Sequence, residues 1–291
     1  MGQALIEQII NGTMMGGIYM LVALGMVLIY GVMHVLNFAH GVLFMLGGYV
    51  CHFAFTQLFG NYFLAVLAAM AVLAVVGLLL EWGLFRRLRD NLRMQVIASL
   101  GLILVIQNGV IAIWGPNALQ MRVAPTEIRV PLGDLSFTLQ HFLIIGVVGG
   151  TILALWLFLT RSRIGTALRA TSQNPEAAQV VGIDANRMYL LSFLIGCALA
   201  ALGGALLGPL FLIFPTMGDL PLLKGLAAIV IGGMGSVPGA IIGGLAIGIV
   251  EAVSTLYIPT DYRDSVVFAA LIAVLLLRPQ GLFGMRVRGE A

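Results

Sequence analysis

Histidine and serine side chains are the groups in this chain that could carry hydrolytic or metal-assisted chemistry. His34 and His40 stand six residues apart, which places them on different faces of a helix, and no carboxylate lies nearby to complete a zinc site. Ser236 lies in "GMGSVPG", which does not match the serine motif of α/β hydrolases. We therefore predict no catalytic residue, no metal site and no cofactor. A serine protease built on Ser236 is the enzymatic alternative.

Lys224 is the single lysine of the chain, so it alone could serve a phosphate-binding loop. That motif ends in Gly-Lys-Ser or Gly-Lys-Thr, whereas Lys224 follows Leu223 and precedes Gly225. The chain is therefore predicted not to be an enzyme and to lack this nucleotide site. Any energy from ATP must then come from a partner subunit.

The composition indicates a protein dissolved in lipid. Of the 291 residues, 60% are hydrophobic and 9% are charged, and the mean hydropathy is +1.07. Soluble domains carry roughly 45–50% apolar and about 25% charged residues. Cys51 and Cys197 both lie inside apolar runs, so no disulfide is expected. No basic residue precedes the first apolar run, so we expect no cleaved signal peptide.

Long apolar runs predict an all-α polytopic membrane protein, because a helix needs about 20 such residues to cross the hydrocarbon. We expect about eight spans within a single transmembrane domain over residues 1–291. They lie near 10–33, 36–59, 62–85, 94–114, 138–160, 188–214, 222–256 and 262–278. The alternating ten-residue strands of a membrane β-barrel are not the pattern here.

The arginines set the expected orientation, since basic residues gather on the cytoplasmic side. Three segments carry most of them: Arg86, Arg87, Arg89 and Arg93; Arg161, Arg163, Arg169 and Arg187; and Arg278, Arg286 and Arg288. Three spans precede the first of these segments. The N-terminus is therefore predicted outside, the C-terminus in the cytoplasm, 115–137 as an external loop and 161–187 as a cytoplasmic loop.

With this orientation, the glycine-rich region 222–256 must enter the membrane and return. We place its turn around Ser236 to Gly239 and leave two interpretations open, a broken or re-entrant element lining a pathway and a tight helical hairpin packed on glycines. The early stretch "YGVMHVLNFAHGVLFMLGGYV" also sets polar residues between apolar runs. The candidate residues of a translocation path are Asn37, His40, Gly41, Gly235, Ser236 and Glu251.

Charged residues within the apolar regions are few, and such residues usually face a cavity or a partner. Asp219 and Lys224 flank the outer entrance of the glycine-rich region, where they could pair with each other or meet a docking protein. Glu251 is the best candidate for a buried functional carboxylate. A proton-coupled carrier would need several such groups, so this composition disfavours it.

The most polar stretch, "TSQNPEAAQVVGID" at 171–184, predicts a short helix in the cytoplasmic loop. Asn174 suits the N-cap, Pro175 the first turn, and Glu176 the positive end of the helix dipole, while Gly182 ends the helix. A helix of about seven residues does not persist alone in water, so it must dock on something. The candidate docking residues are Arg169, Asn174, Glu176, Ala177, Ala178 and Gly182.

"EAAQVVG", residues 176–182, resembles the Glu-Ala-Ala-x-x-x-Gly loop of ABC-importer permeases, where this loop forms a coupling helix against the ATPase. "RATSQNPEAAQVVGID" resembles the branched-chain amino acid permeases in particular. The stretch at 30–50, "GGMGSVPGAIIGGLAIGIVE" and "PQGLFG" are similar to their H-type subunit. The sequence departs from the family where "LLSFLIG" replaces the usual Ile-x-Leu-Pro ending of the loop.

The resemblance implies one permease domain in a larger importer of branched-chain amino acids, driven by ATP through alternating access. It implies a heterodimer with a second permease subunit, two cytoplasmic ATPase subunits and an extracytoplasmic solute-binding protein, in the bacterial plasma (inner) membrane. Two alternatives stay open. One is the same machine carrying urea or short amides, and the other is a stand-alone secondary carrier or channel.

Overall fold

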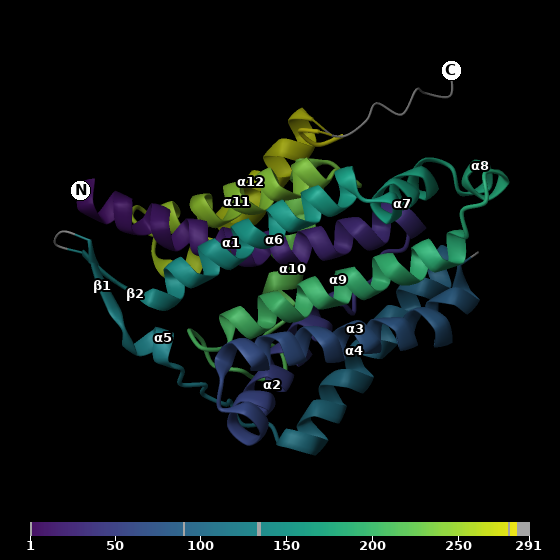
Figure 1. Cartoon of the computed structure of the whole chain (residues 1–291). Helices are drawn as coiled ribbons and strands as arrows, with labels where there is room; N and C mark the ends of the chain where they lie inside the picture. Colours follow the sequence, from purple (N-terminus) through teal and green to yellow (C-terminus); the bar gives the residue numbers. More distant parts are fainter. Residues whose placement is uncertain (1, 90, 133–134, 279, 284–291) are drawn as a thin grey trace.

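The computed structural model describes residues 2–89, 91–132, 135–278 and 280–283, so Arg286 and Arg288 lie outside the described residues. Figure 1 shows a bundle of roughly aligned helices. The helices are α1 (Gly2–Met33), α2 (His40–Phe53), α3 (Tyr62–Gly83), α4 (Leu92–Trp114), α5 (Ala124–Glu127), α6 (Leu139–Arg161), α7 (Arg163–Gln173), α8 (Pro175–Val180), α9 (Ala185–Leu207), α10 (Asp219–Gly232), α11 (Val237–Ser254) and α12 (Arg263–Leu277). A π-helical extension, Ala54–Phe59, continues α2.

Among the described residues, seven helices are long and apolar enough to cross a membrane: α1, α2 with its extension, α3, α4, α6, α9 and α11. The prediction of an all-α polytopic membrane protein is confirmed. The helix α10 has 14 residues and α12 has 15, which is short for a crossing. The helix α1 begins at Gly2 and so extends the predicted span near 10–33, whereas α2 begins at His40 rather than near 36 and α9 ends at Leu207 rather than near 214.

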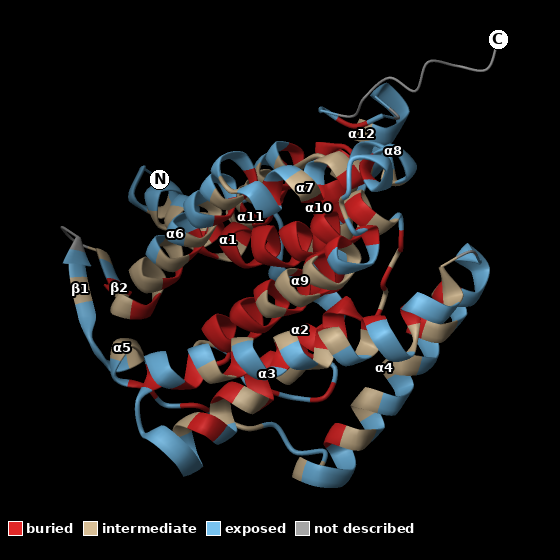
Figure 2. Ribbon diagram, turned by 45° about the vertical axis from the view of Figure 1, so that its right-hand side comes forward, coloured by how far each residue is buried: buried red, intermediate tan, exposed pale blue. Residues whose placement is uncertain are grey.

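The helices α1 and α9 form the centre of the bundle, and α4 lies at its edge. Figure 2 shows the buried residues concentrated on α1, α2, α9 and α10, whereas α4 is mostly exposed. Val105 and Ile113 of α4 are 69% and 72% exposed. Such apolar surface is stable only against lipid or another subunit, which agrees with a membrane protein.

Small residues let α1 and α11 touch through their backbones. Gly12 and Gly16 on α1 face Gly248 and Gly244 on α11, and a Cβ built on Gly12 would lie 2.8 Å from the carbonyl oxygen of Gly248. On each helix the two glycines are four residues apart, which is the small-xxx-small pattern that allows close helix packing in membranes. This contact holds α11, the second half of the glycine-rich region, against the central helix.

The predicted external loop, 115–137, contains short elements that the sequence did not reveal. It includes α5 and leads into an antiparallel hairpin of β1 (Arg129–Leu132) and β2 (Leu135–Thr138), in which Arg129 pairs with Thr138 and Leu132 with Leu135. Leu119 and Ile213 exchange two backbone hydrogen bonds of 2.8 and 2.9 Å, which fasten the loop to the segment after α9. This hairpin and the N-terminal end of α1 lie opposite α8 in the bundle (Figure 1).

Candidate translocation and coupling sites

The short helix α8 is built from the local signals that predicted it. Asn174 is its N-cap, and the Asn174 Oδ1 atom accepts a hydrogen bond of 2.9 Å from the amide of Ala177. Pro175 occupies the first turn, where backbone N–H groups have no partner inside the helix, so the N–H group that proline lacks is not needed. Gly182 has φ 87°, the left-handed conformation that ends helices. The predicted short helix is therefore confirmed over Pro175–Val180.

Most of α8 faces away from its own chain. Ala178 alone is buried there, whereas Glu176 and Ala177 are exposed and Val180 and Val181 are 87% and 74% exposed. In the part of the chain that the structure describes, no ion pair joins Arg169 to Glu176. Glu176, Val180 and Val181 thus form a protruding, partly apolar surface on the most polar part of the chain.

The far end of α8 leads into α9 through a second cap and an arginine contact. Asp184 caps α9 by accepting hydrogen bonds from the amides of Asn186 and Arg187. The Arg89 side chain, in the segment between α3 and α4, donates to Asn186 Oδ1, pairs with the buried carboxylate of Glu81, and lies 4.4 Å from the ring centroid of Tyr189. We call the side chains of Arg89, Glu81 and Asn186 the Arg89 clasp. It joins α9 to α3 and sets two of the basic segments at the same end of the bundle.

The first break in the helical structure separates α1 from α2. His34 has φ 56°, and residues 34–39 leave the helical conformation. His40, the first residue of α2, packs on Gly25, because a Cβ built on Gly25 would lie 2.6 Å from His40 Nε2. Since Gly25 precedes the end of α1 by eight residues, α2 begins about 12 Å short of that end. Non-helical backbone therefore lies beside α1 within the bundle rather than beyond its end, where neighbouring protein or a cavity must satisfy its polar groups.

The second break separates α10 from α11. Gly233 and Gly235 have φ 104° and 83°, and Ser236 caps α11 by accepting a hydrogen bond of 3.1 Å from the amide of Gly239. The turn thus occupies 233–236, earlier than the predicted 236–239, because Ser236 acts as a cap rather than as a turn centre. The two helices pack closely where glycines meet, as the hairpin interpretation expected, although α11 with 18 residues is long enough for a crossing.

The segment after α12 completes the end of α10. The amides of Leu282 and Phe283 donate hydrogen bonds of 2.8 and 2.9 Å to the carbonyl oxygens of Ile231 and Gly232. A helix end leaves such carbonyl groups without partners inside the helix. Gly281 makes the approach possible, since it has φ 75° and a Cβ there would lie 2.6 Å from the amide nitrogen of Gly233. This contact gives Gly281, Leu282 and Phe283 of the predicted tail motif a structural role at the second break.

Replacing Gly281 with alanine is expected to destabilise the protein by about 1–3 kcal/mol, because a side chain at positive φ is strained and here also collides with Gly233. The matched control is Gly101→Ala in α4, where no atom lies within 4 Å of the new Cβ. Alanine is favoured over glycine in a helix by about 1 kcal/mol, so the control keeps or gains stability. The thermal unfolding midpoint of the purified protein measures both. Equal midpoints for the two variants would contradict the proposed contact.

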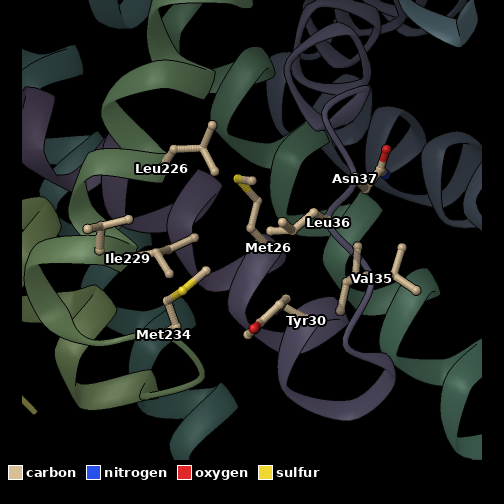
Figure 3. Close-up of a pocket in the computed structure, with 10 residues that line it drawn as sticks. Met26, Tyr30, Val35, Leu36, Asn37, Leu226, Ile229 and Met234 are labelled. Carbon is tan, nitrogen blue, oxygen red and sulfur yellow. The ribbon is translucent and has the colours of Figure 1, made fainter. Parts of the chain in front are cut away.

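A pocket lies between the two breaks. Its wall includes Met26 and Tyr30 of α1, Asn37 of the 34–39 segment, and Leu226 and Met234 at the α10 side (Figure 3). The last turn of α1 lies close to the second break, since a Cβ on Gly31 would lie 3.9 Å from the carbonyl oxygen of Gly235. We call this space the break pocket.

The predicted path residues divide into three groups, of which Glu251 forms the third. Asn37 lines the break pocket, and Gly235 and Ser236 form the turn beside it. His40 is buried against α1, and Gly41 packs on Gly218, where a Cβ would lie 2.6 Å from the carbonyl oxygen. Neither of these two residues lines the pocket.

Glu251 also lies away from the pocket, in a buried network of charges. Lys224 Nζ lies 2.7 Å from Glu251 Oε1 and 2.7 Å from Asp264 Oδ1, and the Tyr19 hydroxyl donates a bond of 2.9 Å to Glu251 Oε2. Arg263 Nε is 3.6 Å from Glu251 Oε1. These five residues, the Lys224 network, join α1, α10, α11 and α12. Sequence reasoning found Glu251 and Lys224 but missed their partnership.

The Asp219–Lys224 pair left open by the sequence does not form. Asp219 instead accepts a hydrogen bond of 3.3 Å from Gln107 Nε2 on α4. Five residues on a helix turn the side chains about 140° apart, so Asp219 and Lys224 face different neighbours. Lys224 faces the interior, where it is 2% exposed.

Comparison with known proteins identifies the family. The family described as "Branched-chain amino acid transport system / permease component" matches residues 8–275. The permease protein LivH of Escherichia coli is 35% identical, with 96% of this chain and 95% of LivH covered. BraD of Pseudomonas aeruginosa is 34% identical over 96% and 95%, and the probable LivH of Methanocaldococcus jannaschii is 32% identical over 96% and 93%.

One solved structure, PsaBC from Streptococcus pneumoniae in complex with Fab, is similar at a TM-score of 0.43 and 17% identity. The structural match covers 94% of this chain and 88% of the PsaBC chain. The family match and the relatives each extend over nearly the whole sequence. The chain therefore belongs to the family of permease components of the branched-chain amino acid transport system.

Proposed function

We propose that this chain is a permease subunit of an ATP-driven importer for branched-chain amino acids, in the plasma (inner) membrane of a bacterium. The observation that carries the proposal is the protruding surface of α8, with Glu176 beside the exposed Val180 and Val181. An apolar surface of this kind outside the bundle needs a partner. The family membership makes a cytoplasmic ATPase the partner that fits, and two ATPase subunits serve the pair of permeases.

The contacts of α8 explain how a movement of the ATPase would be transmitted to the membrane helices. On one side, α7 packs on the end of α6, where Gly165 approaches the backbone of Phe158 and Leu159. On the other side, the Asp184 cap leads into α9, and the Arg89 clasp joins α9 to α3. Movement of α8 would thus tilt central helices relative to one another, which is what alternating access requires.

The substrate and the remaining partners follow from the site and the family. The described wall of the break pocket is apolar apart from Asn37 and the Tyr30 hydroxyl, which suits an aliphatic side chain better than urea or a short amide. A second permease subunit would complete the path as a heterodimer. An extracytoplasmic solute-binding protein would deliver the amino acid to the end that carries the β1–β2 hairpin.

Reconstitution tests the function directly. The chain is placed in liposomes with its second permease, the ATPase subunits and the binding protein, and uptake of leucine, isoleucine and valine is measured with and without ATP. We expect uptake only from the complete, ATP-supplied assembly. Transport by the chain alone at the same rate would overturn the proposal in favour of a carrier or channel.

Replacing Asn174 with alanine is expected to lower ATP-driven uptake about fivefold without unfolding the chain. The N-cap contributes about 1 kcal/mol, which lowers the ratio of formed to unformed helix by about that factor, and a helix this short has little stability of its own in reserve. The matched control is Asn61→Ala, which removes the N-cap of α3 at the opposite end, where Asn61 accepts from Phe63 and Leu64. Uptake per assembled complex measures the difference. The coupling role of α8 fails if both variants transport equally well.

A further inference from the structure

A second pocket lies at the end of the bundle that carries the β1–β2 hairpin, between the hairpin and the N-terminal ends of α1 and α6 (Figure 1). The pocket and its mouth hold about 610 Å³ not filled by atoms, of which about 310 Å³ accepts the centre of a water molecule. One water needs about 10–15 Å³ by the latter measure, so a small organic molecule fits here. The break pocket, with about 20 Å³, has room for about one water. We call the second space the hairpin pocket.

The local structure explains why polar side chains line the hairpin pocket. Arg129 lies opposite Thr138 in the hairpin register, and Ser136 is two residues from Thr138, so these three side chains share one face of the hairpin. Glu7 and Asn11 are four residues apart on α1 and therefore share one face of that helix. All five residues line the pocket. One wall thus carries an arginine and the other a glutamate.

Two contacts hold the hairpin over the start of α6. The Thr138 Oγ1 atom lies 2.7 Å from His141 Nδ1. The buried ring of Phe137 packs against the rings of His141 and Phe142, at centroid distances of 6.0 and 6.1 Å. The chain itself therefore positions the wall of the hairpin pocket, as is usual for small-molecule sites, which are largely formed before the ligand binds.

The two charged side chains of the wall lack partners in the described part of the chain. No ion pair there joins Glu7 to Arg129, and no hydrogen bond between described residues engages either side chain. The two charges sum to zero, so a simple anion or cation would be attracted by one residue and repelled by the other. A zwitterion satisfies both, because its carboxylate accepts from a guanidinium while its ammonium group donates to a carboxylate.

We propose that the hairpin pocket binds the zwitterionic head of a free amino acid, with Arg129 donating to its carboxylate and Glu7 accepting from its ammonium group. Asn11 and Ser136 supply further donors and acceptors. The inference rests on the proposed function, in which the binding protein delivers an amino acid to this end of the bundle. Since the contacts are made to the head, leucine, isoleucine and valine are expected to bind alike.

Protection from labelling tests the site. Ser136→Cys is labelled with a maleimide in the importer of this chain, its second permease and the ATPase subunits, assembled in nanodiscs without the binding protein. The buried Cys51 and Cys197 give the background of the wild type. When leucine fills about nine tenths of the sites, labelling at position 136 is expected to fall about tenfold. The control is Glu127→Cys, an exposed position of the same loop that does not line the pocket, where leucine should change nothing.

Two analogues of leucine test whether the head is recognised as a zwitterion. Leucinamide lacks the carboxylate and 4-methylpentanoate lacks the ammonium group, whereas both keep the aliphatic side chain. We expect neither to protect Ser136→Cys at the concentration at which leucine does. Equal protection by both analogues would overturn the proposal, and so would the absence of protection by leucine. If the binding protein protects and leucine does not, the pocket is a docking surface for that protein instead.

Arg129→Gln and Glu7→Gln, each combined with Ser136→Cys, separate the two contacts. Each is expected to raise the leucine concentration for half protection about tenfold or more, because a hydrogen bond to a charged group is lost. Arg129→Gln should also remove the difference between leucine and leucinamide, and Glu7→Gln that between leucine and 4-methylpentanoate. A merely structural role of either residue would not produce these two specific losses.

The matched controls are Arg122→Gln and Glu127→Gln, which remove the same charges from exposed positions of the same loop outside the pocket. Both should show the protection of Ser136→Cys alone. Unchanged protection in the Arg129 and Glu7 variants would refute the site even if uptake by the complete importer is normal. If the wild-type assembly takes up no branched-chain amino acid and leucine still protects, the proposed function fails and the site stands.

Discussion

Replacing Glu176 with lysine is expected to abolish ATP-driven uptake while the chain remains folded and inserted. Glu176 has no ion-pair partner in the described chain, so its loss breaks no internal salt bridge. A lysine at the positive end of α8 is unfavourable by about 0.3–1 kcal/mol, which is small for a protein of this size. The large effect arises at the ATPase, where an unfavourable charge at a docked interface costs several kcal/mol.

Uptake into vesicles, normalised to the amount of inserted permease, measures this effect, and co-purification of the ATPase reports whether docking itself is lost. Glu127→Lys is the matched control, because Glu127 lies in the first turn of the short helix α5 on the predicted external loop. We expect that control to transport at the wild-type rate. Near-normal uptake by Glu176→Lys would show that α8 does not carry the coupling.

The features that the sequence predicted well are those determined within a few residues. Asn174, Pro175 and Gly182 predicted both ends of α8, because capping and left-handed glycine conformations act across one helical turn. The apolar runs likewise predicted the membrane helices, because every crossing must satisfy its backbone internally. Local physics of this kind needs no knowledge of the remaining fold.

Features that depend on distant contacts were missed or misplaced. Polar residues in 30–50 indicated an interruption, but hydropathy could not show that α2 begins at His40, packed beside Gly25. Asp219 was considered for Lys224 because it is close in sequence, whereas the partners of Lys224 are Glu251 on α11 and Asp264 on α12. The Arg89 clasp joins residues almost a hundred positions apart, as the 97-residue separation from Asn186 shows. Only the packing of the helices brings these groups together.

Asn37, Gly235 and Ser236 were identified as path candidates from a polar residue or a glycine turn within apolar sequence. The structure brings them to the break pocket or its edge. Glu251 was selected by the same reasoning but belongs to the Lys224 network. A rare charge in an apolar run indicates that the group has a partner, and it does not reveal whether that partner is the substrate or another helix.

The second large effect is expected for Lys224→Met, which should leave the protein unable to accumulate in a stable form. The substitution removes the cation that lies 2.7 Å from both Glu251 and Asp264. Glu251 is nearly buried, with a side-chain exposure of 7%, so its charge cannot be satisfied by water. Breaking a buried ion pair by removing one partner costs about 3–5 kcal/mol, a large part of the stability of a typical domain.

A second substitution separates this charge effect from simple damage to packing. Adding Glu251→Gln to Lys224→Met leaves Arg263 to balance Asp264, and the amide oxygen of the new glutamine side chain can still accept from the Tyr19 hydroxyl. We therefore expect the double variant to recover much of the stability lost by Lys224→Met, measured as the thermal midpoint and yield of the detergent-solubilised protein. Arg263→Met is the control for losing a cation, because Arg263 is 43% exposed and lies 3.6 Å from Glu251. Water screens its charge, so its loss is expected to cost about 0–1 kcal/mol. A double variant no more stable than Lys224→Met would mean that Lys224 acts through its packing and that the network does not hold α10, α11 and α12 together by charge.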